Sequence, residues 1–170
     1  MRGIERLRSI ERSTEPLANA LPELSKDATI LVRLLRVAGF GLSDYFSDVF
    51  RGMGISETMY HLLAVLYASE GGRNSPTQLS ELIGTGRANM TKVIGNLEKL
   101  QLVHRETDTG DARRSVVTIT EKGKALMNEI TPKVSNPITN AFNGLSKAEQ
   151  KQLSDLLRKT IVSFDRAKTY

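Results

Sequence analysis

The chain has 170 residues, of which 39% are hydrophobic and 5% aromatic, which suffices for one sizeable core built mainly from aliphatic side chains. Lys and Arg outnumber Asp and Glu by 24 to 19, so the net charge of +5 favours a polyanionic partner without proving one. The lack of cysteine in the sequence excludes disulfides, thiolate metal sites and thiol-based oxidation sensing, and 2 histidines argue against a zinc sensor.

The N-terminal third contains a weak helix pattern and then a strong one. Residues 3–13 place only Ile4, Leu7 and Ile10 at helical spacing, which predicts a marginal helix that needs a packing partner. Residues 26–50 have more apolar positions than one narrow face requires, so this long helix must be covered on more than one side. No apolar run reaches membrane-spanning length and residues 1–20 lack a signal core, so we expect a cytoplasmic protein without a membrane partner.

A pair of helices follows, and the second has an unusual outer face. Ser75-Pro76-Thr77-Gln78 predicts a helix start, and Gly84-Thr85-Gly86 ends that helix. A second helix opens near Arg87 with one apolar stripe. Its opposite face carries small, amide and basic residues, namely Ala88, Asn89, Lys92, Gly95, Asn96 and Lys99. Asn, Lys and Arg pair with base edges in the DNA major groove, whereas the alternative interpretation is an ordinary solvated face.

The segment after this helix predicts a β-hairpin with a basic tip. Residues 102–106 and 114–119 are β-prone and are separated by turn-forming residues. Arg113 and Arg114 lie at the tip beside Asp111, whose carboxylate can orient a guanidinium. Such an arginine suits a narrow minor groove. Alone, the hairpin is better read as a plain surface turn, but after a recognition-type helix the DNA interpretation is favoured.

The C-terminal part is helical. Residues 122–142 predict a helix that is kinked or broken at Pro132 and Pro137. The capping box that starts at Ser146 opens a last helix, whose apolar stripe consists of Leu153, Leu156, Leu157, Ile161 and Phe164. The fold prediction is therefore a mainly α protein with a small β-hairpin wing, in which a winged helix-turn-helix is joined to a region of long helices. Within one continuous domain, residues 1–27 form an N-terminal extension with a possible extra helix, 28–54 and 125–170 the region of long helices, and 55–124 the winged helix-turn-helix.

The order of elements and the motifs resemble the multiple antibiotic resistance regulator (MarR) family of bacterial transcription factors over residues 28–165. Asp111-Ala112-Arg113, with residues 117–120 and Glu121-Lys122-Gly123-Lys124 after it, is similar to the family's wing motif and the helix start that follows. Residues 86–92 are similar to its Ser-Arg-Ala-Thr-Val-Thr-Arg segment, with Gly86 and Asn89 in place of Ser and Thr. The resemblance implies a homodimer in which residues 28–54 and 125–170 form a helical dimerisation region with interlocked terminal helices, whereas the alternative is that these helices pack within one monomer. It also implies that residues 55–124 bind a pseudo-palindromic double-stranded DNA operator and that the protein usually represses transcription.

Two sets of site residues are predicted. The expected DNA contacts are Ser75, Thr77, Thr85, Arg87, Asn89, Thr91, Lys92, Asn96, Arg113 and Arg114, with Asp111 orienting the wing. The resemblance also implies a small aromatic carboxylic acid effector, similar to benzoate, hydroxybenzoate or hydroxynicotinate, bound between the dimerising helices and the DNA-binding region. The expected lining of that cleft is Arg33, Tyr45, Arg51, Met59, Tyr60 and His61, although Met59, Tyr60 and His61 also suit a plain core. The hypothesis is that the acid changes the spacing of the recognition helices and lowers DNA affinity.

Two other classes of function fit the sequence less well. An enzyme is disfavoured because the sequence shows no nucleophile–base pair, phosphate-binding glycine loop or metal-ligand spacing, and no cofactor or metal is expected. A winged helix used only for protein contacts would suit an acidic or apolar exposed face better, and Lys92, Asn96 and Arg113 argue against it.

Overall fold

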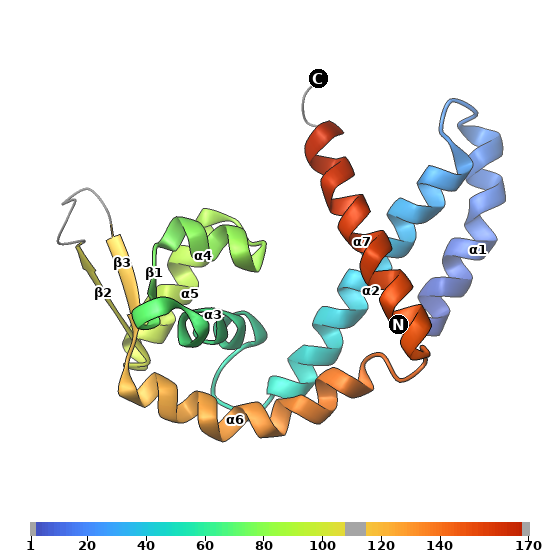
Figure 1. Ribbon diagram of the computed structural model, residues 1–170. Coiled ribbons are helices and arrows are strands. Elements are labelled where there is room, and N and C mark those ends of the chain that lie inside the picture. The colour runs from blue at the N-terminus through green and yellow to red at the C-terminus, as the bar shows by residue number, and fades with distance from the viewer. Residues whose placement is uncertain (1–2, 108–114, 168–170) are drawn as a thin grey trace. The chain divides into compact units, whose positions relative to one another are not determined.

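The protein is built of α-helices and one small antiparallel sheet (Figure 1). The computed structural model describes residues 3–107 and 115–167. The chain forms two compact units, Met1–Asn128 and Glu129–Tyr170. Among the helices of the described residues, none combines the length and apolar character that crossing a membrane requires.

The first two helices form a hairpin (Figure 1). Helix α1 (Gly3–Ala20) is longer than the weak helix predicted over residues 3–13. It packs against α2 (Lys26–Phe50), which supplies the packing partner that such a weak helix requires. Ile10 of α1 is buried in this contact at 5% exposure. Arg33 of α2 reinforces it by donating to the Ile10 carbonyl and to the Ser13 hydroxyl. Ser25 caps α2, because its Oγ accepts a hydrogen bond from the Ala28 N–H.

The apolar excess predicted for α2 is exposed to solvent in the single chain. Leu31 is 61% exposed, and Leu34, Leu35, Leu42 and Tyr45 are each at least 36% exposed. At its C-terminal end α2 is anchored by aromatic packing instead. Phe46 packs on Phe50 with ring centroids 6.4 Å apart, and Phe50 packs on Tyr60 of the next helix at 5.1 Å.

The winged helix-turn-helix follows. It contains α3 (Glu57–Ala68), the 3-10 turn η1 (Glu70–Gly72), β1 (Arg73–Asn74), α4 (Pro76–Ile83), α5 (Arg87–Lys99), β2 (Val103–Thr107) and β3 (Ser115–Ile119). The strand order is β1-β3-β2, with Val103 opposite Ile119 and Arg73 opposite Thr118. The side chains buried most deeply among these elements are Leu62, Leu63, Leu66, Leu79, Met90, Ile94, Leu97 and Val117. The apolar stripe predicted for α5 therefore faces this core, which leaves its polar side outward.

The last two helices confirm one prediction and correct another. The prediction for Pro132 and Pro137 is a kink or a break. Helix α6 (Glu121–Asn140) continues through both prolines, so a break there is wrong, whereas the kink stays a prediction. Helix α7 (Lys147–Ala167) begins at the predicted capping box, where the Glu149 carboxylate accepts hydrogen bonds from the Ser146 N–H and hydroxyl, both at 2.7 Å. The apolar stripe of α7 is exposed in the single chain, like that of α2.

Candidate nucleic-acid interface

The turn between α4 and α5 is fixed by hydrogen bonds from both sides. Gly84 ends α4 in the left-handed conformation, with φ of 70°, and its N–H donates to the Glu81 and Ser80 carbonyls. Ser80 is 7% exposed, and its hydroxyl donates to the Thr85 carbonyl at 2.5 Å while the Thr85 N–H donates back to the Ser80 carbonyl at 3.0 Å. The buried Ser80 side chain therefore acts together with these backbone hydrogen bonds to fix the turn between α4 and α5. Sequence patterns did not single out Ser80, since a lone serine in an amphipathic helix carries no specific signal.

The N-terminus of α5 is open to a ligand. Gly86 is its N-cap and supplies no side-chain hydrogen bond, so the first N–H groups of the helix lack a capping acceptor. Asn89 donates from Nδ2 to the Thr85 hydroxyl at 2.8 Å, which fixes its amide. Because that amide carries two N–H groups and a carbonyl, one donor and the acceptor remain for a base edge. The free backbone groups and the positioned amide point to recognition of a hydrogen-bonding, negatively charged partner.

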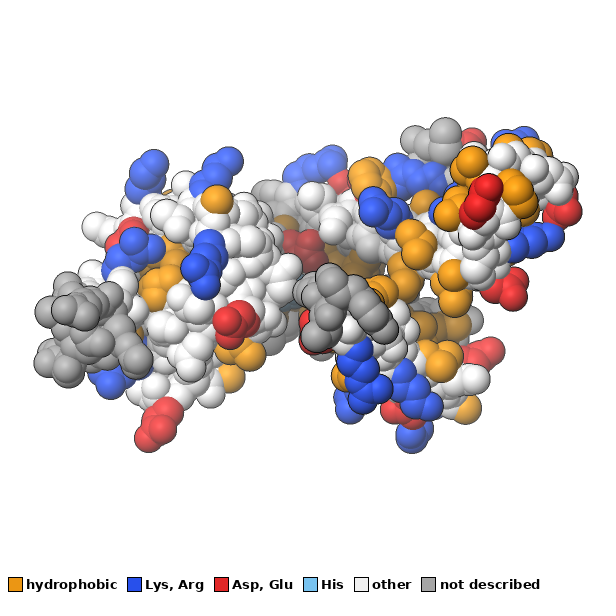
Figure 2. Space-filling model, turned by 90° about the horizontal axis from the view of Figure 1, so that it is seen from above, with side chains coloured by type: hydrophobic (Ala, Val, Ile, Leu, Met, Phe, Trp, Pro, Cys, Tyr) orange, Lys and Arg blue, Asp and Glu red, His pale blue; other side chains and the backbone are white. Residues whose placement is uncertain are grey.

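The exposed face of α5 matches the sequence prediction closely. Arg87, Asn89, Lys92 and Asn96 are all exposed. Thr91 is exposed too, but its hydroxyl donates to the Arg87 carbonyl at 3.0 Å and is thus engaged by its own helix. The part of the molecule that holds α3–α5 and the sheet shows Lys and Arg side chains over a largely uncharged surface (Figure 2). A helix with such a face can enter the major groove without charge repulsion.

A polar groove lies beside the N-terminus of α4. Its volume is about 870 Å³, and its lining includes Arg73, Asn74, Thr77, Gln78 and Ser115. Ser75 is the N-cap of α4, since its Oγ accepts from the Gln78 N–H at 3.2 Å and donates to the Gln78 side-chain oxygen at 3.1 Å. Ser75 thus holds the helix start, whereas Thr77 is exposed toward solvent. Arg73 was not among the predicted contacts, because β1 is two residues long and is recognisable only from its pairing with β3.

The tip of the wing lies outside the described residues. Asp111, Arg113 and Arg114 all fall in the segment 108–114, so their predicted roles stay predictions. The strands on either side of that segment are paired from Val103–Ile119 to Thr107–Ser115, which confirms the hairpin arms.

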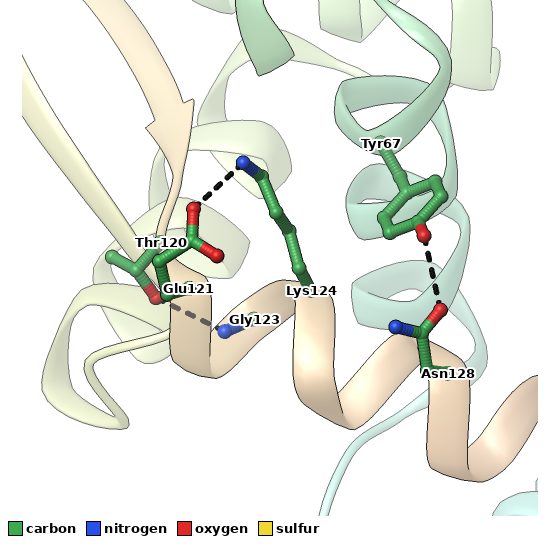
Figure 3. A network of polar contacts seen from close by, with 6 residues as sticks. All are labelled: Tyr67, Thr120, Glu121, Gly123, Lys124 and Asn128. Atoms are coloured by element: carbon green, nitrogen blue, oxygen red, sulfur yellow. Dashed lines mark hydrogen bonds and ion pairs between the residues drawn. The ribbon is translucent and has the colours of Figure 1, made fainter.

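Hydrogen bonds join the residues that follow α5 to the start of α6. Thr120 caps α6, because its Oγ1 accepts from the Gly123 N–H at 3.0 Å (Figure 3), and it also donates to the Gln101 carbonyl at 2.8 Å. Lys122 donates to the Leu100 carbonyl at 2.9 Å, directly after the last turn of α5. Gly123 leaves no room for a side chain, since a Cβ there would stand 2.3 Å from the Leu102 carbonyl oxygen. The recognition helix and the first turns of α6 therefore have a fixed relative orientation.

The structure brings together some of the predicted effector residues but not all. Tyr45 packs on Phe46 at 5.2 Å and Tyr60 on His61 at 6.0 Å, so an aromatic chain runs from the end of α2 into α3. Met59 and Tyr60 are buried in the core, whereas His61 is exposed. Arg51, which pairs with Asp48, lies at this α2–α3 corner. Arg33 contacts α1 instead, about 27 Å from Arg51 along the helix at ~1.5 Å per residue. It therefore cannot share one small ligand with Arg51.

Among the described residues, ionisable side chains form no metal-binding cluster. Within the described part of the chain, no group of three or more His, Asp or Glu side chains could hold a metal ion. Hydrogen bonds shift side-chain pKa values in other parts of the chain. Those from Ser146 lower the pKa of Glu149, the bond from Lys133 lowers the pKa of Glu129, and the bond to Glu15 raises the pKa of Lys26.

Comparisons with known proteins agree with this geometry. The MarR family model matches residues 55–115. The chain is similar to the transcriptional repressor MprA of Escherichia coli K12, with 29% identity over 80% of this chain and 77% of MprA. It is also similar to YkoM of Bacillus subtilis, an uncharacterised HTH-type transcriptional regulator, with 34% identity over 62% of this chain and 68% of YkoM. Among solved structures, BpsR of Bordetella bronchiseptica, whose DNA binding is regulated by 6-hydroxynicotinic acid, aligns with a TM-score of 0.69 and 26% identity over 76% of this chain and 97% of BpsR.

These similarities confirm the predicted fold class, a winged helix-turn-helix with additional long helices. The curated relatives are transcription regulators, which agrees with the expectation that the chain is not an enzyme.

Proposed function

Because this chain belongs to the MarR family of transcriptional regulators, we propose that it is a sequence-specific repressor that binds double-stranded DNA as a homodimer. The observation that carries the proposal is the outer face of α5, where Asn89, Lys92 and Asn96 are exposed on a helix whose preceding turn is fixed in part by the buried Ser80. Amide side chains recognise adenine through one donor and one acceptor, and both remain available on Asn89.

The groove beside α4 supplies phosphate contacts in this proposal. Thr77, which is exposed at the N-terminus of α4, and Arg73 of β1 line that groove. Helix N-termini and arginines bind phosphate oxygens and set the register of a protein on the duplex. Arg113 and Arg114, with Asp111 as the orienting carboxylate, extend the contact into the adjacent minor groove.

The homodimer accounts for apolar surface that the single chain leaves exposed. Leu31, Leu156 and Ile161 are each more than half exposed, at 61%, 52% and 60%. Apolar side chains gather over the long helices in Figure 2. Each Å² of apolar surface that is removed from water contributes about 25 cal/mol of stabilisation, so pairing of these apolar faces between two subunits is favourable. Two subunits then place two recognition helices about 34 Å apart, the repeat of the duplex.

We further propose that a small aromatic carboxylic acid releases the DNA. BpsR, whose DNA binding is regulated by 6-hydroxynicotinic acid, supports this part of the proposal. At the α2–α3 corner, Arg51 and the exposed His61 offer partners for a carboxylate, and Tyr45 offers a ring for stacking. A thermal-shift screen of aromatic acids tests it, and the proposal fails if no acid that stabilises the protein also weakens its DNA complex.

The DNA-binding proposal is tested by selecting bound sequences from random duplexes and measuring fluorescence anisotropy on the selected site. Asn96→Ala should weaken binding about 5- to 150-fold and relax the preference at one base pair, as the loss of a base-edge contact does. Lys92→Ala should also weaken binding. Lys159→Ala, which removes an exposed charge from α7, is the matched control and should bind like the wild type. Equal affinity for selected and scrambled duplexes would refute the proposal.

Salt dependence separates phosphate contacts from base contacts. Each lysine or arginine that neutralises a phosphate contributes about 0.9 to the slope of log affinity against log salt. Arg73→Ala should therefore lower that slope by about one unit while preserving the order of preferred sequences. An unchanged slope would remove Arg73 from the interface.

A further inference from the structure

A pocket between α1 and α2 gathers three arginines. Its volume is about 290 Å³, and it is lined by Arg6, Ser9, Ile10, Arg33, Arg36 and Val37. The residues alternate between the two helices at helical spacing, so the pocket exists only while α1 packs on α2. It is distinct from the α2–α3 corner, because Arg36 and Arg51 are separated by about 22 Å of helix at ~1.5 Å per residue.

Two of the three guanidinium groups, those of Arg6 and Arg33, are held in place by neighbouring groups. These contacts use only some of the N–H donors of each guanidinium. The guanidinium of Arg6 stacks over the Phe40 ring, with Cζ 3.9 Å from the ring centroid. This contact uses the flat face of the guanidinium, so the N–H groups along its edges stay available for a hydrogen-bond acceptor. Arg33 donates to the Ser13 hydroxyl and, at 3.5 Å, to the Ile10 carbonyl. A guanidinium has five N–H donors, so each of these groups can still bind a planar acceptor. The pocket is thus pre-organised for one.

The charges in the pocket are uncompensated. The ion pairs between described residues do not include Arg6, Arg33 or Arg36. Three like charges around one small space repel each other, and an anion placed among them removes that repulsion. The pocket therefore favours a negatively charged ligand over a neutral one.

The floor of the pocket selects the class of anion. Ile10 is buried at 5% exposure and Val37 is partly buried, so an apolar surface lies between the charged groups. Fully hydrated anions such as sulfate gain nothing from such a surface, whereas an organic acid buries its apolar body there. Arginine binds a carboxylate through two parallel hydrogen bonds.

We propose that the α1–α2 pocket binds a small organic carboxylate, with Arg6 and Arg36 pairing the carboxylate and Ile10 and Val37 contacting its apolar body. The bound acid connects the two helices and holds α1 on α2. This site is additional to the effector site at the α2–α3 corner, and its occupancy does not depend on DNA binding.

The test measures binding of 4-fluorobenzoate to the full chain by ¹⁹F NMR and isothermal titration calorimetry. The wild type should bind the acid in the millimolar range or tighter, and 4-fluorobenzamide, its neutral analogue, should bind at least about tenfold more weakly. In the Arg51→Gln background, which removes a carboxylate partner at the α2–α3 corner, Arg36→Gln and Arg6→Gln should each weaken the remaining binding of the acid at least about tenfold. Arg8→Gln is the matched control, since Arg8 is exposed on the same helix and does not line the pocket.

Several outcomes would overturn the proposal. In the Arg51→Gln background, equal binding with and without Arg36→Gln or Arg6→Gln would do so, as would equal binding of acid and amide. If Arg51→Gln abolishes acid binding while Arg36→Gln does not, the acid occupies only the α2–α3 corner, which refutes this pocket and leaves the effector proposal intact. Arg36 is exposed, so the variant should fold, and retention of its circular dichroism spectrum and DNA affinity without acid verifies that it does.

Discussion

Gly123 is the position where one added methyl group should have the clearest effect on stability. In Gly123→Ala the Cβ would lie 2.3 Å from the Leu102 carbonyl oxygen and 2.7 Å from Cγ1 of Ile119. The carbonyl cannot move away freely, because it accepts the Thr120 N–H at 3.0 Å. Overpacking of this kind costs about 1–3 kcal/mol, and loss of that hydrogen bond adds about 1 kcal/mol. The better helix propensity of alanine returns about 1 kcal/mol. We expect a net loss of about 1–3 kcal/mol.

Thermal unfolding followed by circular dichroism measures this loss. For a chain of this size, 1 kcal/mol lowers Tm by about 2–4 °C, so Gly123→Ala should melt about 2–12 °C below the wild type at equal protein concentration. Gly95→Ala is the matched control, because Gly95 lies inside α5 and a Cβ there would meet nothing within 4 Å. That change should raise stability by about 0.5–1 kcal/mol. If Gly123→Ala melts at or above the wild-type temperature, the packing explanation is wrong.

Three further predictions concern the turn and the caps. Ser80→Ala should lower the free energy of unfolding by about 1–2 kcal/mol in urea titrations, because it removes a buried hydroxyl that fixes the turn, and an unchanged midpoint would contradict that role. Gly84→Ala should cost about 1–2 kcal/mol, since φ is 70° there, whereas Gly86→Ala, with φ of −70°, should cost clearly less; equal losses would argue against backbone strain. Hydrogen bonds from Ser146 lower the pKa of Glu149 in the folded state below 4.5, so the unfolded chain binds the proton more readily. The cap should stabilise α7 above that pH and lose its effect as pH falls through the folded-state pKa, and the stability difference from Glu149→Gln, measured by thermal melts, should disappear in acid.

Local chemistry explains which parts of the fold were predictable. The helix start at Ser75, the stop at Gly84 and the capping box at Ser146 each use hydrogen bonds between residues close in sequence, so the residue types alone reveal them. The polar face of α5 was predictable for a similar reason, because the apolar stripe fixes which side is buried.

Contacts between distant segments were not predictable in the same way. The strand β1 exists only through pairing with β3, more than forty residues later in the chain. The placement of Arg33 depends on how α1 packs, and α1 itself looked too weak to form without a partner. Family resemblance placed Arg33 with Arg51 in one cleft, but the straight course of α2 separates them.

The prolines of α6 show how a helix can continue through residues that disfavour it. Pro132 and Pro137 cannot donate hydrogen bonds to the carbonyls of Asn128 and Lys133, at about 3 kcal/mol per internal proline relative to alanine. Both carbonyls belong to exposed residues, so water can solvate them. Before this stretch α6 is held firmly, because Gly123 packs against Leu102 and the Asn128 side chain accepts a hydrogen bond from the Tyr67 hydroxyl at 3.0 Å (Figure 3). The first turns of α6 are thus held against the residues that follow α5, whereas the two prolines lie beyond Asn128, where the two compact units divide.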